Sequence, residues 1–218
     1  MKCSARVAPD LYTTRSHSLH RIMERTMNEF PTWLTATLAS DATEGQGVLP
    51  NTILPLQSAL CVVGPARVVL ISQDDNLAVR KVLEVSPAPG SVLVVAGGST
   101  SRAATIGGLM TLEMQNAGIA GFVTDGLIRD SREIRESGFG VWCRGVTPMA
   151  PHKVGPAYIG GSISLGGTII QDGDLVIADD DGVVIWPQER ISELLARAEA
   201  RLQQDNARLA QLLEKKRT

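Results

Sequence analysis

Short continuous apolar runs alternate with amphipathic stretches in the middle of the chain. The run at 91–96 reads SVLVVA, and the segments 119–124 and 139–143 are similar apolar runs. Continuous apolar runs of this length are typical of strands that are covered on both faces of a parallel sheet. The stretches at 107–115 and 129–137 have helical patterns that end close to a glycine. This alternation of strand and helix predicts parallel βαβ units.

The segments on the N-terminal side of this unit are less regular. Residues 30–38 (FPTWLTATL) predict a short amphipathic helix, with a proline that the first helical turn tolerates. Residues 60–71 (LCVVGPARVVLI) predict either a strand pair or one bent strand, broken at 64–65 where glycine precedes proline. A further helix is expected at 77–85, because its apolar residues fall on one face.

Beyond residue 144 the chain has glycine-rich, β-like runs, which predict antiparallel strands packed on the parallel unit. From residue 187 a long helix is expected to reach the C-terminus. Apolar or small residues recur along it in steps of three and four, at Ile191, Leu195, Ala198, Leu202, Leu209 and Leu212. A helix of roughly 30 residues is about 45 Å long, which exceeds one small domain. Either part of it packs on a neighbouring subunit, or it is a single amphipathic helix on its own domain.

The composition fits one globular domain. The 218 residues are 44% hydrophobic and 20% charged with a net charge of −2, so no basic field favours nucleic acid as a partner. No apolar run is long enough to span a membrane. The three cysteines are far apart and form no CxxC pair, which argues against a zinc knuckle and predicts a cytoplasmic protein. We expect a flexible arm at 1–28, an α/β domain at 29–187 and the terminal helix at 188–218.

The candidate chemistry gathers between residues 97 and 133. Gly107 and Gly108 stand at the expected start of a helix, where free N–H groups and a partial positive charge suit a small carboxylate or phosphate. Alternatively, the two glycines only let the helix pack closely on a strand. The chain has neither GxGxxG nor GxxxxGK[ST], so this loop is not a nucleotide-binding fingerprint.

Arg129 and Asp130 follow a buried strand and an Asp-Gly turn. Ligands of open α/β sheets bind just beyond the carboxyl ends of such strands. Arg129 can grip a carboxylate or a carbonyl oxygen with paired N–H donors, and Asp130 can hold a hard cation directly. The alternative interpretation of the pair is a structural salt bridge or a helix cap.

Between about residues 30 and 187 the chain has an Asp-Asn pair before a helix, a VLVV strand and three motifs, which read AGFVTDGLIRD, RGVTP and QDGDLVIADDDGVVIWP. On these segments together, the chain resembles the RraA-like family. The family includes class II pyruvate aldolases that act on 4-hydroxy-4-methyl-2-oxoglutarate and 4-carboxy-4-hydroxy-2-oxoadipate, and the regulator of ribonuclease E activity. The resemblance implies a compact α/β/α domain with a swivelling-type β-barrel core, assembled as homotrimers or homohexamers.

The resemblance also implies roles for individual residues. Asp130 would ligate a divalent metal, Mg²⁺ or Mn²⁺, and Arg129 would bind the pyruvyl group and steady its enolate. The backbone N–H groups of Leu109 and Met110 would bind the substrate carboxylate. In the family's aldolases an acid, which orients a metal-bound water and supports proton transfer, stands at the position that is Gly108 here. This departure removes part of the base that aldol cleavage needs.

Three acidic residues near this stretch are candidates to compensate for Gly108. Glu133 and Asp125 are the nearer ones, whereas Glu113 is expected to point away from the site. Glu133 also lies four residues after Arg129, so a structural ion pair is the alternative for it. Asp125 could equally bind the backbone of its own turn.

Residues farther along the chain are weaker candidates. His152 could take part in proton transfer or could simply be solvated, and Lys153 has the same status. No feature of the sequence marks a desolvated pocket in which a lysine would form a Schiff base. A glutamate of the terminal helix could enter a neighbouring subunit's site, the candidates being Glu193, Glu199 and Glu214.

These observations predict a divalent-metal-dependent carbon–carbon lyase, an aldolase or an oxaloacetate-type decarboxylase. Its substrate would be a small pyruvyl-containing keto acid that reacts through a metal-stabilised enolate. Decarboxylation needs less help from a base and therefore tolerates Gly108 better. Two alternatives remain open, a non-catalytic protein-binding regulator and a diverged enzyme that uses the same scaffold on a different acid.

Overall fold

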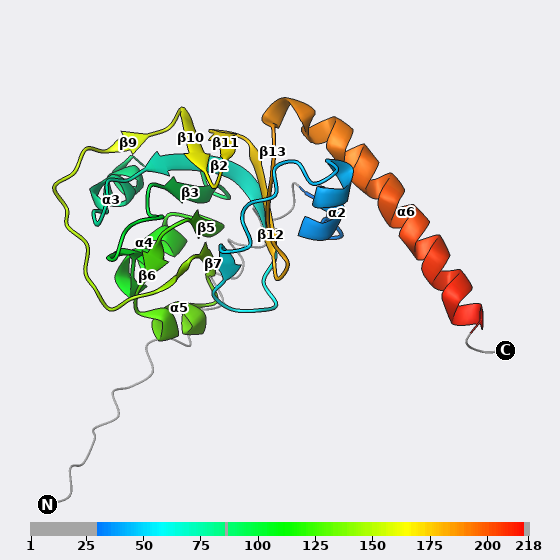
Figure 1. The fold of residues 1–218 in the computed structure, drawn as a ribbon, viewed down its shortest axis with the longest axis horizontal. Coiled ribbons are helices and arrows are strands. Elements are labelled where there is room, and N and C mark those ends of the chain that lie inside the picture. Colours follow the sequence, from blue (N-terminus) through cyan, green and yellow to red (C-terminus); the bar gives the residue numbers. More distant parts are fainter. Residues whose placement is uncertain (1–29, 86, 216–218) are drawn as a thin grey trace, which may run out of the picture.

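The computed structural model describes residues 30–85 and 87–215, so the arm predicted at 1–28 lies outside the described residues. Its centre is an eight-stranded sheet in the order β1-β7-β5-β3-β2-β12-β13, with β9 also paired to β2 (Figure 1). Four of the strands are parallel neighbours, namely β2 (Val62–Leu70), β3 (Val92–Ala96), β5 (Gly121–Thr124) and β7 (Gly140–Cys143). These strands confirm the predicted parallel unit.

Antiparallel strands flank the parallel set and curl the sheet into a nearly closed barrel. One of them, β12, pairs with both β2 and β13, while β1 pairs with β7 at the other edge. A separate hairpin is formed by β10 and β11. These strands are β1 (Leu54–Pro55), β9 (Tyr158–Ile159), β10 (Ser162–Leu165), β11 (Thr168–Gln171), β12 (Leu175–Asp179) and β13 (Gly182–Trp186).

The parallel strands are buried on both faces, which explains their continuous apolar sequences. In β3, Val92, Val94 and Ala96 face a core that includes the β10–β11 hairpin. Leu93 and Val95 face the opposite core, which the helices cover. The covering helices are α3 (Leu77–Glu84), α4 (Gly108–Asn116) and α5 (Ser131–Ser137).

A second, smaller parallel sheet lies beside the main one, and the sequence pattern did not predict it. Its strands are paired in the order β4-β6-β8. Each has only two or three residues, so none shows a readable period. They are β4 (Ala104–Ile106), β6 (Leu127–Ile128) and β8 (Gly145–Val146).

The strand predicted to break at 64–65 is continuous through Gly64 and Pro65. The ladder with β3 begins only at Ala66, opposite Val92, so the missing N–H group of Pro65 removes no bond from that ladder. Gly64 is needed for a different reason, because a Cβ atom there would collide with the carbonyl oxygen of Gly90.

The helix predicted at 30–38 starts later than expected. Helix α2 spans Ala36–Ala42, and Thr35 caps it by accepting a hydrogen bond from the amide of Leu38 (3.3 Å). The hydrophobic residue Phe30 packs against the same core cluster without being helical. The amphipathic pattern therefore predicted correctly that this segment is partly buried, but it predicted a helix start that is too early.

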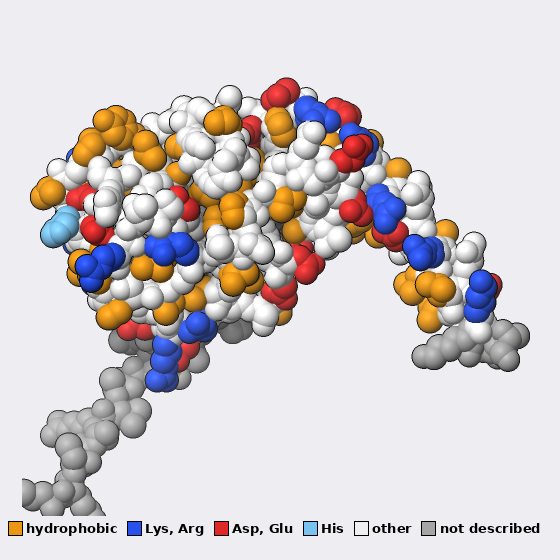
Figure 2. Space-filling view, viewed as in Figure 1, with side chains coloured by type: hydrophobic (Ala, Val, Ile, Leu, Met, Phe, Trp, Pro, Cys, Tyr) orange, Lys and Arg blue, Asp and Glu red, His pale blue; other side chains and the backbone are white. Residues whose placement is uncertain are grey.

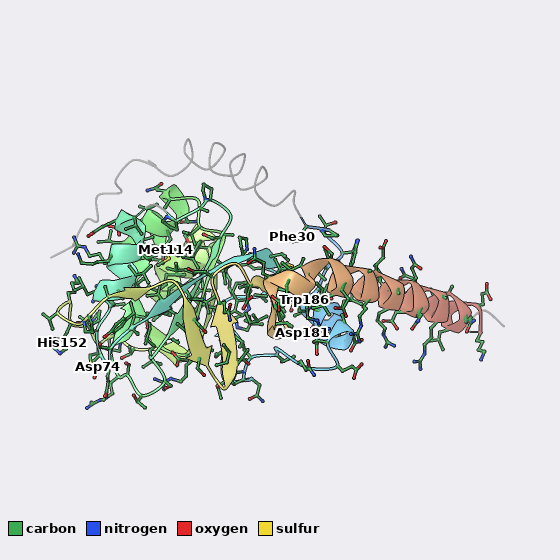
Figure 3. All side chains as sticks on the ribbon, turned by 90° about the horizontal axis from the view of Figure 1, so that it is seen from above. Phe30, Asp74, Met114, His152, Asp181 and Trp186 are labelled. Atoms are coloured by element: carbon green, nitrogen blue, oxygen red, sulfur yellow. The ribbon has the colours of Figure 1, made fainter. Side chains whose placement is uncertain are left out.

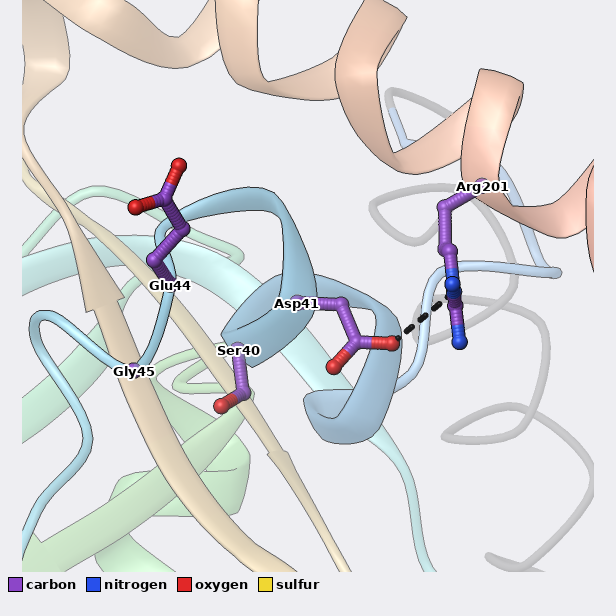
Figure 4. A pocket seen from close by; sticks show the side chains of 5 residues that line it. All are labelled: Ser40, Asp41, Glu44, Gly45 and Arg201. Atoms are coloured by element: carbon purple, nitrogen blue, oxygen red, sulfur yellow. Dashed lines mark ion pairs between the residues drawn. The ribbon is translucent and has the colours of Figure 1, made fainter.

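The long C-terminal helix α6 (Ile191–Lys215) follows a short 3₁₀ turn, η2 (Gln188–Arg190), and confirms the predicted terminal helix. Its first half packs on α2, and its second half projects away from the body (Figure 1). Asp41 of α2 pairs with Arg201 of α6, with Oδ2 and Nε 3.2 Å apart (Figure 4). Over residues 30–85 and 87–215, no helix is both long and apolar enough to cross a membrane.

Candidate functional site

The small parallel sheet brings together two segments that lie twenty residues apart in the sequence. Ile106 of β4 is in register with Ile128 of β6, and its carbonyl oxygen accepts a hydrogen bond from the amide of Arg129 (3.0 Å). As a result, the start of α4 lies directly beside Arg129 and Asp130. The amide of Gly108 donates to Asp130 Oδ2 at 3.0 Å, which joins the two predicted halves of the site.

The start of α4 presents free backbone donors. Gly107 is the N-cap and has no side chain to satisfy the first amides of the helix. The first helical hydrogen bond runs from the amide of Thr111 to the carbonyl oxygen of Gly107. Among the described residues, the amides of Leu109 and Met110 have no hydrogen-bond acceptor. These two donors and the positive end of the helix form a cradle suited to a carboxylate.

Gly107 allows the close approach of the two segments. A Cβ atom at this position would lie 2.5 Å from Asp130 Oδ2 and 3.0 Å from Arg129 Cγ. Any larger residue would therefore push the Arg-Asp pair away from the cradle. The structure thus confirms the packing role of this glycine, whereas the anion-binding role stays a prediction.

Asp130 has a backbone conformation that side-chain-bearing residues seldom adopt. Its φ and ψ angles are 55° and 38°, in the left-handed region, although it is the N-cap of α5. Its side chain does not cap α5 and instead reaches across to Gly108. The surrounding structure must hold a residue in such a strained conformation. Residues of this kind cluster at functional sites.

Arg129 and Asp130 lie close enough for an ion pair, with Nε and Oδ2 3.5 Å apart. Both side chains remain about two-fifths exposed, at 40% and 39%. A buried structural salt bridge would hide both groups from solvent. Here each group keeps free donor or acceptor atoms that a ligand can use.

Glu133 lies against Gly108, the position at which the resemblance implies an acid. Its carboxylate occupies the space that a Cβ atom at Gly108 would need. Among the described residues no ion pair joins it to Arg129, so the structural ion pair considered for this residue is not formed. Glycine at position 108 therefore makes room for a carboxylate that comes from α5.

The other candidates from the sequence occupy different places. The carboxylate of Asp125 accepts hydrogen bonds from the amides of Gly97 (3.3 Å) and Gly98 (2.7 Å), so it clamps a neighbouring loop and not its own turn. Glu113, which was expected to point away, lines the cleft described below. That expectation was wrong because the cleft extends along one side of α4 beyond its first turn.

A cleft of about 280 Å³ opens beside the cradle, the Arg-Asp pair and Glu113. This volume is at the low end of the range for small-molecule sites. Its walls come from α3, α4, the β6–α5 junction and the 147–157 loop. The lining residues are Asn76, Arg80, Ile106, Gly107, Leu109, Met110, Glu113, Arg129, Asp130, Ala150, Pro151 and Lys153.

The 147–157 loop is anchored by two aspartates whose role the sequence did not reveal. Asp75, which is buried, accepts hydrogen bonds from the amides of Val154 (2.7 Å), Gly155 (3.0 Å) and Leu77 (2.8 Å). Burial raises the pKa of Asp75, but these three donors outweigh it and hold the pKa below its usual value. The Asp-Asn pair before the helix was the one feature of the sequence that could have indicated this role. The neighbouring sequence does not show which loop the pair would bind.

Asp74 anchors the other side of the same region. Its carboxylate accepts hydrogen bonds from the amides of Ala103 (2.8 Å) and Arg102 (2.6 Å), and these donors lower its pKa. Its carbonyl oxygen accepts a hydrogen bond from the amide of His152 (2.7 Å). Figure 3 shows Asp74 and His152 close together at the end of the body away from α6. His152 is therefore held through its backbone, and it does not line the cleft.

The residues at the cleft suit a hydrated hard cation better than a fully protein-ligated metal. No group of three or more His, Cys, Asp or Glu side chains able to hold a metal ion occurs within 30–85 and 87–215. Asp130 supplies one partly exposed carboxylate, and Mg²⁺ commonly takes one or two carboxylates with water and substrate oxygens. Asp130 is therefore the residue of this cleft that would hold a hydrated Mg²⁺ or Mn²⁺ ion.

Two relatives with aldolase names are similar to this chain. A protein from Halalkalibacterium halodurans, provisionally named a 4-hydroxy-4-methyl-2-oxoglutarate aldolase, is 42% identical over 177 residues, covering 80% of this chain and 83% of the relative. The 4-hydroxy-4-methyl-2-oxoglutarate aldolase of Thermus thermophilus is 36% identical over 115 residues, which cover 53% of this chain and 70% of the relative.

Solved structures share the fold. The crystal structure of Streptomyces coelicolor RraAS2, described as an unusual member of the RNase ES inhibitor RraA family, has a TM-score of 0.74 and 29% identity. That match covers 94% of this chain and 100% of the other. The RNA-processing inhibitor RraA from Thermus has a TM-score of 0.65 and 30% identity, covering 71% and 93%. A family model described as RraA-like, aldolase/RraA, matches residues 35–185, and the chain therefore belongs to the RraA-like family.

Proposed function

We propose that this protein is a lyase that cleaves the carbon–carbon bond next to the pyruvyl group of a small keto acid. One observation carries the proposal: the free amides of Leu109 and Met110 share a cleft with Arg129 and Asp130. A pyruvyl group presents a carboxylate beside a keto oxygen, which matches a double amide donor beside a guanidinium. The aldolase names of relatives that are 36% to 42% identical support the same reaction class.

The binding of the substrate follows from the charges in the cleft. The Leu109 and Met110 amides would take the carboxylate, and the Arg129 guanidinium would donate to the keto oxygen. In both aldol cleavage and decarboxylation, the electrons of the broken C3–C4 bond move into the C2–C3 bond and negative charge develops on that oxygen. Donors fixed at this place before the reaction stabilise the developing charge more than the ground state.

Asp130 is the residue that would hold a divalent cation, Mg²⁺ or Mn²⁺. When bound, the cation would supply a Lewis acid that polarises the keto oxygen. The hydrogen bond from the Gly108 amide to Asp130 Oδ2 fixes one oxygen of the carboxylate and leaves Oδ1 for another partner.

Glu133 is the residue that we propose for proton transfer. Its carboxylate stands against Gly108 at the start of α4, next to the residues that line the cleft, although Glu133 is not itself one of them. In aldol cleavage it would accept the proton of the 4-hydroxyl group and could return it to C3 of the product. Decarboxylation has no hydroxyl proton to remove and needs only the proton transfer to C3. Glu133 should therefore matter less for oxaloacetate than for 4-hydroxy-4-methyl-2-oxoglutarate.

The test is pyruvate release from oxaloacetate and from 4-hydroxy-4-methyl-2-oxoglutarate, each with Mg²⁺ or Mn²⁺ and after chelation. We expect turnover that chelation removes and that Arg129→Met lowers by at least about 100-fold. Arg132→Met is the matched control, because Arg132 pairs with Glu136 on the outer side of α5. Absence of pyruvate from both substrates with either metal would refute the proposal.

A second candidate is a protein-binding regulator without catalysis. The observation in its favour is the similarity to two solved structures described as inhibitors of RNA processing or of an RNase. The same pyruvate-release assay separates the two functions, because a regulator without catalysis releases no pyruvate and does not depend on Arg129 for it. Inhibition of a ribonuclease that survives Arg129→Met, together with no lyase activity, would favour the regulator.

A further inference from the structure

One buried polar side chain reaches the cleft from outside the segments that carry the proposed chemistry. Asn76 lies at the start of α3, lines the cleft and is only 3% exposed. It is the N-cap of α3, but its side chain forms no capping hydrogen bond. The carboxylate of Asp75 instead accepts a hydrogen bond from the amide of Leu77 (2.8 Å). The side chain of Asn76 therefore does not serve its own helix.

The side-chain NH₂ group of Asn76 holds both sides of the cradle. Its Nδ2 atom donates to the carbonyl oxygen of Thr105 (3.0 Å), in the strand just before the N-cap Gly107. The same atom donates to Sδ of Met110 (3.3 Å), in the first turn of α4. An amide NH₂ group has two N–H donors, so it can make both contacts at once. One side chain from α3 thus ties the strand before the cradle to the helix after it.

The partners of this amide also fix its orientation. A carbonyl oxygen can only accept hydrogen bonds, so the NH₂ group and not Oδ1 must face Thr105. Oδ1 of Asn76 is buried and has no hydrogen-bond partner among residues 30–85 and 87–215. A buried acceptor without a partner lowers the stability of a fold. The two contacts at the cradle thus determine how the side chain lies, although they leave an acceptor unpaired.

We propose that Asn76 is a positioning residue, whose NH₂ group keeps the amides of Leu109 and Met110 directed into the cleft. The inference rests on the proposed function, because it takes the cradle as the site of the substrate carboxylate. Without the NH₂ group, the first turn of α4 loses its link to Thr105 and α3. The loss of two neutral hydrogen bonds corresponds to carboxylate binding that is weaker by about tenfold or more.

Calorimetry with pyruvate and Mg²⁺ compares the Kd of wild type with that of two variants of similar side-chain size. Asn76→Leu removes the donor without adding a charge, so it should weaken binding about tenfold at every pH. In Asn76→Asp the ionised carboxylate cannot donate, but the protonated carboxyl group can. Burial raises the pKa of such a group. The deficit of Asn76→Asp should therefore be about tenfold or more near pH 8 and should shrink towards about pH 5.

The matched control is Asn116→Asp, which makes the same chemical change at an exposed position at the far end of α4. Its affinity for pyruvate should equal that of wild type at each pH. Wild-type affinity in Asn76→Leu would overturn the positioning role. So would a deficit of Asn76→Asp that is the same at both ends of the pH range, which keeps the test decisive if Asn76→Leu does not fold.

Hydrogen exchange without ligand separates the positioning role from the proposed function. The amide of Thr111 donates to the carbonyl oxygen of Gly107 (3.0 Å), so its exchange rate measures opening of the first turn of α4. We expect faster exchange in Asn76→Leu and the wild-type rate in Asn116→Asp. Faster exchange in a protein whose wild type does not bind pyruvate would retain the positioning role and refute the carboxylate cradle. An unchanged rate in Asn76→Leu would overturn the positioning role itself.

Discussion

Gly108 and Glu133 compete for one small space at the start of α4. A side chain at position 108 and the present position of the Glu133 carboxylate exclude each other. The resemblance implies an acid at position 108 in the family's aldolases, and we propose that Glu133 of α5 supplies the carboxylate here. This geometry leads to two predictions about single residues.

Glu133→Gln keeps the size of the side chain and removes its ability to accept a proton. We expect the turnover of 4-hydroxy-4-methyl-2-oxoglutarate to fall by about 10²- to 10⁴-fold, and that of oxaloacetate by less. The measurement is kcat for both substrates. Glu136→Gln is the control, because Glu136 lies on the same helix and pairs with Arg132 at its surface. Full activity of Glu133→Gln would assign the proton transfer to another group.

Gly108→Asp places an acid at the position where the resemblance implies one in the family's aldolases, but its Cβ atom would displace the Glu133 carboxylate. We therefore expect this single substitution to lower turnover in the wild-type background. In the Glu133→Gln background it should recover activity, on the order of tenfold, because one carboxylate then replaces the other. Additive losses in the double variant would show that the two positions do not share a function.

At this scale the sequence and the resemblance were sufficient to predict that Leu109, Met110, Arg129 and Asp130 lie together, and the structure brings them to one cleft. These residues lie within one βαβ region of the sequence, so short motifs were enough to predict that they meet. Lys153 was considered for a different chemistry, and Arg80 was not noticed at all. Both line the cleft because segments that are distant in the sequence come together in the fold. Neither a periodic pattern nor a short motif indicates such contacts.

At the scale of elements, the site depends on short strands and anchored loops that surround a regular α/β core. The long apolar runs predicted the main strands, because burial on both faces leaves a readable pattern. The strands β4, β6 and β8 were not predictable, since two or three residues carry no period. The continuity of β2 through Pro65 was also missed, because it depends on where the neighbouring ladder begins.

The anchoring of the 147–157 loop by Asp75 predicts a dependence of stability on pH. The folded-state pKa of Asp75 is lowered, so its contribution to stability is fully present above the unfolded value of about 3.9 and is lost as the pH falls through the folded value. We expect the gap in urea midpoint between wild type and Asp75→Asn to be largest near pH 7 and to shrink below about pH 4.

The control for this titration is Glu189→Gln, an exposed residue with no role in the loop. Its midpoint should follow that of wild type throughout. A gap for Asp75→Asn that stays constant from pH 7 to pH 3 would mean that the ionised carboxylate does not stabilise the loop. The neutral form would then satisfy the three amide donors equally well.

At the scale of the whole molecule, the apolar stripe of α6 continues beyond the part of the helix that packs on α2. Leu194 and Ala198 are buried, whereas Leu209, Leu212 and Leu213 are 54% to 56% exposed on the continuation of the same apolar stripe. Figure 2 shows hydrophobic side chains near the free end of α6. We propose that this segment packs on another copy of the chain in a homotrimer or homohexamer, as the resemblance implies.

Leu209→Glu/Leu212→Glu is expected to lower the mass of the assembly measured by light scattering, because charges in an apolar contact are costly. The control Gln204→Glu/Gln211→Glu adds the same charge on the opposite side of the helix, at about 100° per residue, and should keep the wild-type mass. A monomeric wild-type protein, or an unchanged mass for the leucine variant, would place this segment outside any interface.

The central claim is that the cleft binds a pyruvyl group and stabilises its enolate. Proton NMR of pyruvate in D₂O tests this without a carbon–carbon bond to break, because enolisation alone exchanges the methyl protons for deuterium. With Mg²⁺ or Mn²⁺, the wild-type protein and Arg132→Met should remove the methyl signal well above the background rate, whereas Arg129→Met should not. Exchange no faster than background in wild type, or equal exchange in Arg129→Met, would contradict the account.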